Sequence, residues 1–174
     1  MGNVAIRGAT VDDIPTVLAL LRELAAYEGR LDIVCIDESL LAEHAFGERA
    51  CAEVLLALVD RDAVGYAIFF PHFGSFRGRP WLYLEDLYVQ PRARGAGVGH
   101  AMMAHLAGLT LKRGWIGMSW KVLDWNESAL DFYRGLGAAT GGGHVAMDLS
   151  GDALMRLAEE APQVGAGTDR VTTP

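Results

Sequence analysis

An apolar stretch at residues 81–89 leads directly into a glycine-rich turn, and this feature most constrains the fold. Both odd and even positions of the stretch are apolar, so the strand that it predicts needs cover on both faces of a sheet. The turn, residues 91–95, precedes a segment up to about residue 113 whose apolar side chains have helical spacing. A buried strand that turns into a helix is typical of an α/β protein, with this strand near the centre of the sheet.

The rest of the chain supplies further strands and helices for the same sheet. Apolar runs and turn residues predict the element order β-α-α-β-β-β-α-β-α-β, a mixed sheet of about six strands flanked by about four helices. The predicted strands besides 81–89 are residues 4–6, 54–59, 64–70, 118–123 and 144–149. Besides the helix that ends near residue 113, the predicted helices of this fold are residues 12–28, 38–46 and 126–136, and residues 71–80 are predicted as a loop. A further short helix is predicted at residues 152–161, after the fold. We expect one α/β domain over residues 1–150, then a short helix and a disordered tail over 151–174.

Composition excludes several classes of protein. The chain has 174 residues, 15 basic and 22 acidic side chains, and a net charge of −7, so it lacks the cationic surface that holds nucleic acid. No apolar run is long enough to span a membrane, and the first residues lack the apolar core of a signal peptide. The two cysteines show no disulfide or metal spacing. These observations predict a cytoplasmic protein without nucleic-acid or membrane partners and without a metal.

The charge is unevenly distributed along the chain. Residues 91–114 carry four basic side chains and no acidic one, whereas residues 1–53 carry ten acidic and four basic side chains. This polarity suits an anionic ligand at the glycine-rich turn and a cationic ligand near the first helices. Solubility alone would also account for the total charge.

The glycine-rich turn is a candidate anion site. With glycine at positions 95, 97 and 99, backbone N–H groups can converge with the positive end of the helix dipole, and Arg92 and Arg94 flank the turn. The spacing matches neither the dinucleotide-binding GxGxxG pattern, because His100 takes the last position, nor a P-loop. The alternative is a tight strand-to-helix turn with incidental glycines.

Two adjacent carboxylates, Glu85 and Asp86, interrupt the apolar strand. Burying a carboxylate is costly unless it is paired or used, which makes the two residues candidates for a general base that takes a proton from an ammonium group. We favour Glu85 as the base and Asp86 as the residue that orients it, although the two roles could be exchanged. The alternative is a structural ion pair with Arg77 or Arg79.

The motifs resemble a known enzyme family. Residues 94–99, with the sequence Arg-Gly-Ala-Gly-Val-Gly, match the Q/R-x-x-G-x-G/A signature of the GCN5-related N-acetyltransferases, the GNAT superfamily. The predicted element order is also that of the family. The segments 23–28, 83–89 and 123–127, followed by Phe132 and Tyr133, are similar to the diamine (spermidine/spermine) and thialysine N-acetyltransferase branch.

The resemblance implies acetyl transfer from the co-substrate acetyl-CoA to a primary amine. It implies that the backbone of Leu87, Tyr88 and Val89 holds the pantetheine arm and that Asn126 contacts CoA. The pyrophosphate would be held by Arg94, Gly95, Ala96, Gly97, Val98, Gly99 and His100. It also implies a homodimer and direct attack in a ternary complex, without a covalent enzyme intermediate.

The resemblance also assigns roles on the acceptor side. It makes Tyr133 the general acid that protonates the leaving thiolate, whereas the residues alone favour a packed core tyrosine. Tyr27, Glu28 and Glu85 would contact the amine, and the alternative for the first two is a solvated helix end. The turn at Gly141 has no carboxylate where polyamine-specific relatives have an acidic turn, which favours a smaller amine, a diamine or a lysine-like amino acid.

Two other functions remain open from the sequence. One is a non-catalytic acyl-CoA-binding or regulatory module on the same fold. The other is an N-acetyltransferase whose acceptor is the amino terminus or a lysine of a protein or peptide. Retention of both strand carboxylates and of Tyr133 argues against the non-catalytic module.

Overall fold

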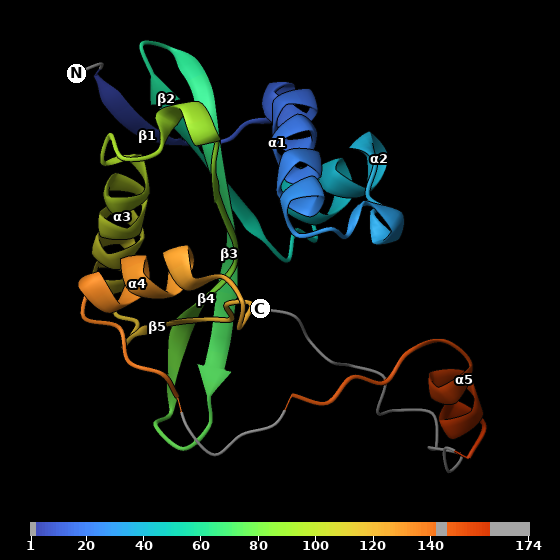
Figure 1. The fold of residues 1–174 in the computed structure, drawn as a ribbon. Helices are drawn as coiled ribbons and strands as arrows, with labels where there is room; N and C mark the ends of the chain where they lie inside the picture. The colour runs from blue at the N-terminus through green and yellow to red at the C-terminus, as the bar shows by residue number, and fades with distance from the viewer. Residues whose placement is uncertain (1–2, 142–145, 161–174) are drawn as a thin grey trace. The chain divides into compact units, whose positions relative to one another are not determined.

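The computed structural model describes residues 3–141 and 146–160, and the chain forms two compact units, residues 1–125 and residues 126–174 (Figure 1). The first unit contains the described sheet, whose five strands lie in the order β1-β2-β3-β4-β5. Neighbours from β1 to β4 are antiparallel, and β4 and β5 are parallel. The strands are β1 (Val4–Gly8), β2 (Glu53–Val59), β3 (Asp62–Gly74), β4 (Arg79–Val89) and β5 (Met118–Trp120). The predicted mixed α/β fold with the strand of residues 81–89 inside the sheet is therefore confirmed.

Two long helices of this unit cover the two faces of the sheet. Helix α1 (Ile14–Tyr27) contacts β3 and β4 on one face, and helix α3 (Val98–Lys112) contacts β4 and β1 on the other (Figure 1). The side chains that α3 buries are Val98, Met102, Met103, Leu106 and Thr110. Strand β4 is thus covered on both faces, as its apolar sequence requires.

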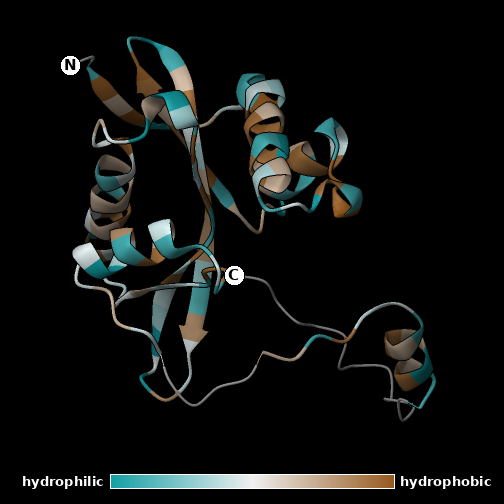
Figure 2. Ribbon diagram, in the orientation of Figure 1, coloured by the Kyte–Doolittle hydropathy of each residue, from teal (hydrophilic) through white to brown (hydrophobic). Residues whose placement is uncertain are grey.

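Residues typical of helix ends lie before and after helix α1. A capping box between Thr10 and Asp13 opens the short 3-10 turn before it, and Arg7 holds the Asp13 carboxylate at 2.6 Å. At its other end Gly29 adopts a positive φ of 69°, which favours glycine. Figure 2 shows hydrophilic and hydrophobic bands alternating along α1, as expected of a helix with one buried side.

A β-bulge in β4 decides which face each of its side chains occupies. Residues paired across antiparallel strands share a face of the sheet, and β3 pairs Phe69 with Leu84 but Ile68 with Asp86. Glu85 is therefore the extra residue of the bulge. Because Ile68 and Phe69 are consecutive, Leu84 lies on one face and Asp86 on the opposite face. Asp86 shares its face with the core beneath α1, to which Tyr66 and Tyr88 belong.

The loop predicted at residues 71–80 is wrong over most of its length. Strand β3 continues to Gly74 and β4 begins at Arg79, so only residues 75–78 connect them. Pro71, the first residue of the predicted loop, lies beyond Phe69, where the pairing of β3 with β2 ends. Its missing N–H therefore interrupts no ladder on that side of the strand.

Three other predicted elements differ in the structure. The strand predicted at residues 118–123 is limited to β5, and the helix predicted at 38–46 is an α-helical turn, α2 (Glu38–Leu41), that continues as a π-helical turn, Ala42–Phe46. The strand predicted at residues 144–149 is wrong over 146–149, which form no strand, and residues 144 and 145 lie outside the described residues. Alternation of apolar residues predicts a strand only where a partner edge is available.

The second unit contains two short helices. Helix α4 (Glu127–Gly135) is capped by the Asn126 side chain, which accepts a hydrogen bond from the Ala129 N–H at 3.2 Å, and Gly137 follows it with a φ of 87°. Helix α5 (Gly151–Glu159) is amphipathic and carries exposed apolar side chains. Among the described residues, no helix is long and apolar enough to cross a membrane.

A pair of glycine substitutions tests the close packing of β3 against β4. A Cβ at Gly65 would lie 2.5 Å from the Tyr88 carbonyl oxygen, whereas a Cβ at the exposed, helical Gly108 meets nothing within 4 Å. We expect Gly65→Ala to lower the free energy of unfolding by about 1–3 kcal/mol. Gly108→Ala should raise it by up to about 1 kcal/mol. Urea unfolding of both variants checks this, and an unchanged Gly65→Ala would contradict the register.

Candidate active site

A buried carboxylate forms the centre of the candidate site. Asp86 is partly buried on the α1 face of β4, and its Oδ2 accepts a hydrogen bond of 3.0 Å from the hydroxyl of Tyr66 on β3. Tyr66 is fully buried, and burial together with the neighbouring Asp86 charge raises the pKa of its hydroxyl, which therefore stays protonated and donates. Tyr66 is not among the site residues predicted from the sequence, because a tyrosine in an apolar strand has no distinguishing signal.

The surroundings of Asp86 make its proton exchangeable near neutral pH. Burial raises the pKa of Asp86 to about 6; the Tyr66 hydrogen bond lowers it, and the charges of Glu85 and Glu28 raise it. Glu85 is exposed at the bulge, and Glu28 follows the last residue of α1. Residues far apart in the sequence thus bring three carboxylates within electrostatic reach of one another. A cationic group is the natural ligand for such a cluster.

The first unit gives no support to the alternative in which Glu85 and Asp86 form structural ion pairs. Among the described residues, neither Glu85 nor Asp86 forms an ion pair with Arg77 or Arg79. Arg77 instead lies over the ring of Trp81, 5.4 Å from its centroid.

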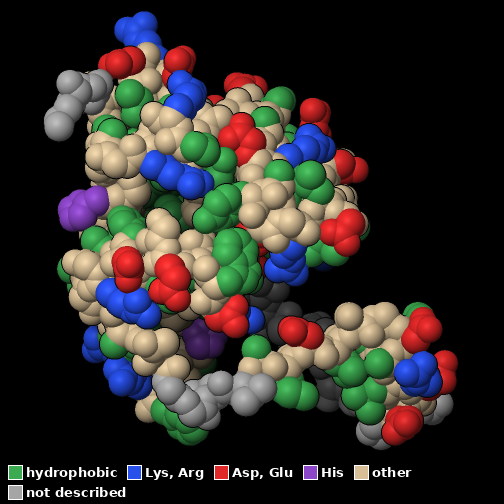
Figure 3. Space-filling model, in the orientation of Figure 1, with side chains coloured by type: hydrophobic (Ala, Val, Ile, Leu, Met, Phe, Trp, Pro, Cys, Tyr) green, Lys and Arg blue, Asp and Glu red, His purple; other side chains and the backbone are tan. Residues whose placement is uncertain are grey.

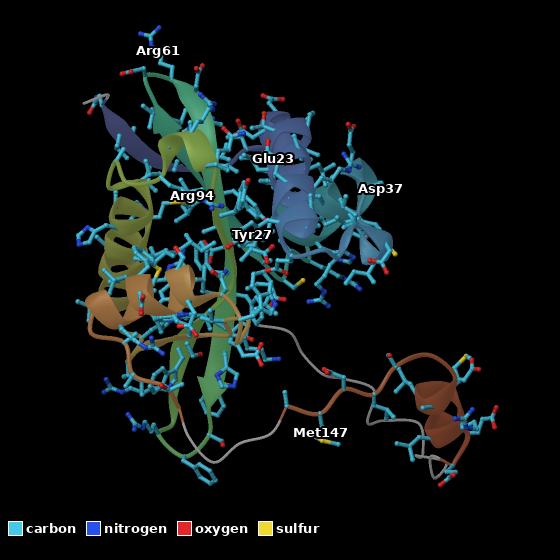
Figure 4. The ribbon with its side chains drawn as sticks, viewed as in Figure 1. Glu23, Tyr27, Asp37, Arg61, Arg94 and Met147 are labelled. Atoms are coloured by element: carbon cyan, nitrogen blue, oxygen red, sulfur yellow. The ribbon has the colours of Figure 1, made fainter. Side chains whose placement is uncertain are left out.

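The end of α1 is joined to the glycine-rich turn through an arginine. The guanidinium of Arg94 lies 5.1 Å from the centroid of the Tyr27 ring and 5.8 Å from that of Tyr88, and its Nε donates to the Val89 carbonyl at 2.9 Å. Figure 4 shows Arg94 and Tyr27 close together, beside α1. The other neighbour of Tyr27 is Trp125, with ring centroids 5.9 Å apart. Tyr27 therefore takes part in aromatic and cationic contacts although 42% of its surface is exposed.

A second hydrogen-bonded group ties α1 to β4 and to the turn. Glu23 accepts from the Tyr88 hydroxyl at 3.1 Å and from the Gln90 side-chain amide at 2.8 Å. Gln90 in turn accepts from Arg92 Nε at 2.9 Å. The Glu23 label in Figure 4 marks its place on α1. Sequence reasoning missed Glu23 and Gln90 as members of the site, although Glu23 begins the segment 23–28 that carried the family resemblance.

The glycine-rich turn has the backbone expected of an anion site. Gly95 and Gly97 have positive φ angles of 75° and 82°, and Gly97 is the residue before the first turn of α3. A Cβ at either position would meet nothing within 4 Å, so the space beside the turn is open. The N–H groups of Val98, Gly99 and His100 in the first turn of α3 lack intrahelical partners and share the positive end of the dipole.

One edge of β4 is available beside Asp86. Strand β5 pairs with β4 only at Leu82, Tyr83 and Leu84. On that side, the backbone from Leu87 to Val89 has no strand partner among the described residues, apart from the Arg94 contact to the Val89 carbonyl. An unpaired strand edge can hold an extended ligand through its backbone groups.

Two predicted site residues belong to the second unit. Asn126 caps α4, and Tyr133 is partly buried within that helix, with its ring centroid 5.1 Å from that of Phe132. Burial raises the pKa of the Tyr133 hydroxyl to about 12, so it holds its proton at neutral pH.

Acidic side chains are present on the surface beside α1. Figure 3 shows acidic side chains at several points over α1 and α2, on the side of the sheet where Glu28 and Asp86 lie.

The residues described by the structure include no group of three or more histidine, cysteine, aspartate or glutamate side chains that could hold a metal ion.

Comparison with known proteins agrees with the fold and the motifs. Residues 20–138 match the model of the acetyltransferase (GNAT) family. The thialysine N-epsilon-acetyltransferase of Bos taurus is 38% identical over 146 residues, which cover 79% of this chain and 85% of that protein. The chain therefore belongs to the GNAT family of acetyltransferases and is an acyltransferase.

Other relatives define the branch and the fold. The spermidine/spermine N(1)-acetyltransferase-like protein 1 of Homo sapiens is 31% identical over 145 residues, which cover 79% of this chain and 21% of that protein. An integron cassette protein from the mobile metagenome of V. cholerae has a structure with a TM-score of 0.76 and 25% identity, covering 90% of this chain and 98% of that one. The resemblance to the diamine and thialysine branch is confirmed.

The raised pKa of Asp86 predicts a pH-dependent cost to stability. Its folded pKa of about 6 exceeds the ordinary value of 3.8, so the folded state binds more protons between these values, and wild-type stability falls as pH rises through this window. Asp86→Asn should therefore match the wild type near pH 4 and be more stable by roughly 1–3 kcal/mol at pH 7. Urea unfolding at both pH values checks this; a constant difference would contradict the raised pKa.

Proposed function

We propose that this protein transfers an acetyl group from acetyl-CoA to the primary amine of a small cationic acceptor. The observation that carries the proposal is the buried Asp86 carboxylate, beside an open strand edge and with Glu28 and Glu85 within electrostatic reach. Three neighbouring carboxylates attract an alkylammonium ion, and the buried one is suited to remove its proton.

Asp86 is the proposed base, and Glu85 helps to attract the amine. Asp86 has the burial and the pKa of about 6 that suit a base at neutral pH, whereas Glu85 is exposed to solvent at the bulge. This exchanges the roles that the sequence alone favoured. The direction of each side chain depends on the bulge, and the sequence does not reveal the bulge.

The proposed reaction proceeds by direct attack in a ternary complex. Asp86 takes one proton from the ammonium, and the freed nitrogen lone pair attacks the thioester carbonyl carbon. The N–C bond forms, the C–S bond breaks, and the sulfur leaves as a thiolate that takes a proton from the Tyr133 hydroxyl. The nitrogen then loses a second proton, and the Tyr133 oxygen takes up that proton. One ammonium and one acetyl-CoA thus give one acetamide, one CoA thiol and one proton.

The residues around the turn suit the co-substrate. The pantetheine arm would lie along the free edge of β4 at Leu87, Tyr88 and Val89, and Asn126 would contact CoA. The pyrophosphate would be held by Arg94, Gly95, Ala96, Gly97, Val98, Gly99 and His100. The positive φ angles, the open space beside the turn and the free amides of α3 support this assignment.

The acceptor that we propose is a diamine or a lysine-like amino acid. The relatives include a thialysine N-epsilon-acetyltransferase and, from Arabidopsis thaliana, an L-ornithine N5-acetyltransferase, both named for amino acids that bear a second amine. Tyr27 and Glu28, at the end of α1, would contact the acceptor. The missing carboxylate at the Gly141 turn, part of which lies outside the described residues, supports a short acceptor. A homodimer in the cytoplasm is part of the same proposal.

An amine panel tests the activity and the base together. With acetyl-CoA, release of CoA thiol is expected for diamines or lysine-like amino acids, with a rate that falls below an apparent pKa of about 6. Asp86→Asn should lower kcat by roughly 10²–10⁴-fold. Glu85→Gln should raise the amine KM and keep the acidic limb of the pH profile.

Several outcomes would contradict this proposal. Binding of CoA without thiol release on any amine would indicate a non-catalytic module. Release only with peptides would indicate a protein N-acetyltransferase. Glu85 would be the base if the acidic limb of the pH profile were lost in Glu85→Gln and retained in Asp86→Asn.

Two further variants should separate co-substrate binding from chemistry. Gly97→Ala forces an alanine into the left-handed region at a φ of 82°, and we expect the KM for acetyl-CoA to rise roughly tenfold. Gly108→Ala, elsewhere on α3, is the control. Tyr133→Phe should instead lower kcat and leave that KM unchanged. Steady-state kinetics check both, and a Tyr133→Phe variant with full kcat would exclude it as the acid.

A further inference from the structure

We infer that Tyr66 is a positioning residue that holds one oxygen of Asp86, so that Oδ1 is the atom that receives the proton. This inference rests on the proposed function, because it requires Asp86 to be the base. It concerns a side chain that neither the family signature nor the strand carboxylates point to.

The sheet register places Tyr66 where only its hydroxyl can reach the site. Tyr66 pairs with Tyr88 and Ile68 pairs with Asp86, so the two tyrosines and Asp86 share the face beneath α1. The Tyr66 ring is fully buried in the core, 6.4 Å from the Tyr88 ring. A hydroxyl buried to this degree needs a partner, and it finds Asp86 Oδ2 at 3.0 Å.

The hydrogen bond makes the two oxygens of Asp86 inequivalent. Within the part of the chain that the structure describes, Tyr66 is the only hydrogen-bond donor to this carboxylate, and it contacts Oδ2 alone. A carboxylate without such a contact can turn about its χ2 torsion, which has a broad preference, and present either oxygen. With Oδ2 held by a buried ring, Oδ1 keeps one direction. Fixed geometry is what a base needs for efficient proton transfer.

The same bond adjusts the charge state of Asp86. Two carboxylates face it, Glu85 from its own strand and Glu28 from the end of α1, and both favour the protonated form together with burial. Tyr66 is the group that opposes them. The hydroxyl of the neighbouring Tyr88 donates to Glu23 instead, so it does not replace Tyr66 at Asp86.

The variant Tyr66→Phe tests the inference because it removes the hydroxyl and keeps the ring. A lost hydrogen bond of ordinary strength should move the acidic limb of the kcat/KM profile upward by about one pH unit. On the plateau above the acidic limb, we expect kcat to fall roughly 3–10-fold, because Oδ2 is no longer held and Oδ1 no longer keeps one direction. The KM for acetyl-CoA should not change.

Tyr83→Phe is the matched control, since Tyr83 is on β4, the strand of Asp86, but packs against Phe70, with ring centroids 5.1 Å apart. Its pH profile should match that of the wild type. Replacing Tyr66 with 4-aminophenylalanine keeps an N–H donor on the ring and should restore much of the plateau rate. This replacement also serves as the test if Tyr66→Phe does not fold.

The outcomes distinguish the inference from the function on which it rests. If Asp86→Asn abolishes the acidic limb and Tyr66→Phe leaves both limb and plateau unchanged, Tyr66 is a core residue only and the inference is wrong. If Asp86→Asn keeps the acidic limb of the pH profile, Asp86 is not the base, and the proposed function is wrong at that point. A limb shift in Tyr83→Phe as large as that in Tyr66→Phe would also overturn the inference.

Discussion

The β-bulge at Glu85 is the constraint on which the site depends. Without it, Asp86 would lie on the same face of β4 as Leu84, in the apolar layer beneath α3, where a carboxylate would have no polar partner. The extra residue turns the second half of the strand over. Leu82 and Leu84 therefore fill one core, while Asp86 and Tyr88 face α1 and its polar groups. The inserted residue thus separates the part of β4 whose leucines pack on one face from the part whose Asp86 lies on the other face.

Helix α1 connects the two ends of the site. Its last turns bring Glu28 near Asp86, and the same turns carry Glu23 and Tyr27, which hold Gln90 and Arg94. Glu28, one of the three neighbouring carboxylates, and the contact with Arg94 of the glycine-rich turn are therefore both placed by the end of one helix.

The sequence predicted those parts that local patterns encode. The apolar residues on both faces of the segment 81–89 indicated a central strand, which the structure confirms. The glycines at 95 and 97 indicated a turn, and in the structure both adopt positive φ angles. Pairing between strands is not local, and the sequence therefore missed the continuation of β3 past Pro71 and the absence of a strand at 146–149. The bulge and the Tyr66 contact depend on register as well. For that reason the sequence pointed to both carboxylates as candidates but did not decide between them.

Burial of the proposed base would also lower an energetic barrier to amine acetylation. In water, a carboxylate of ordinary pKa leaves an alkylammonium ion protonated, because their pKa values differ by about six units. Moving the pair into a less polar site disfavours both charged forms, which raises the pKa of the acid and lowers that of the amine. Asp86, with a pKa of about 6, already shows the first of these shifts. The neutral pair of carboxylic acid and free amine then becomes accessible, and the free amine is the species that attacks a thioester.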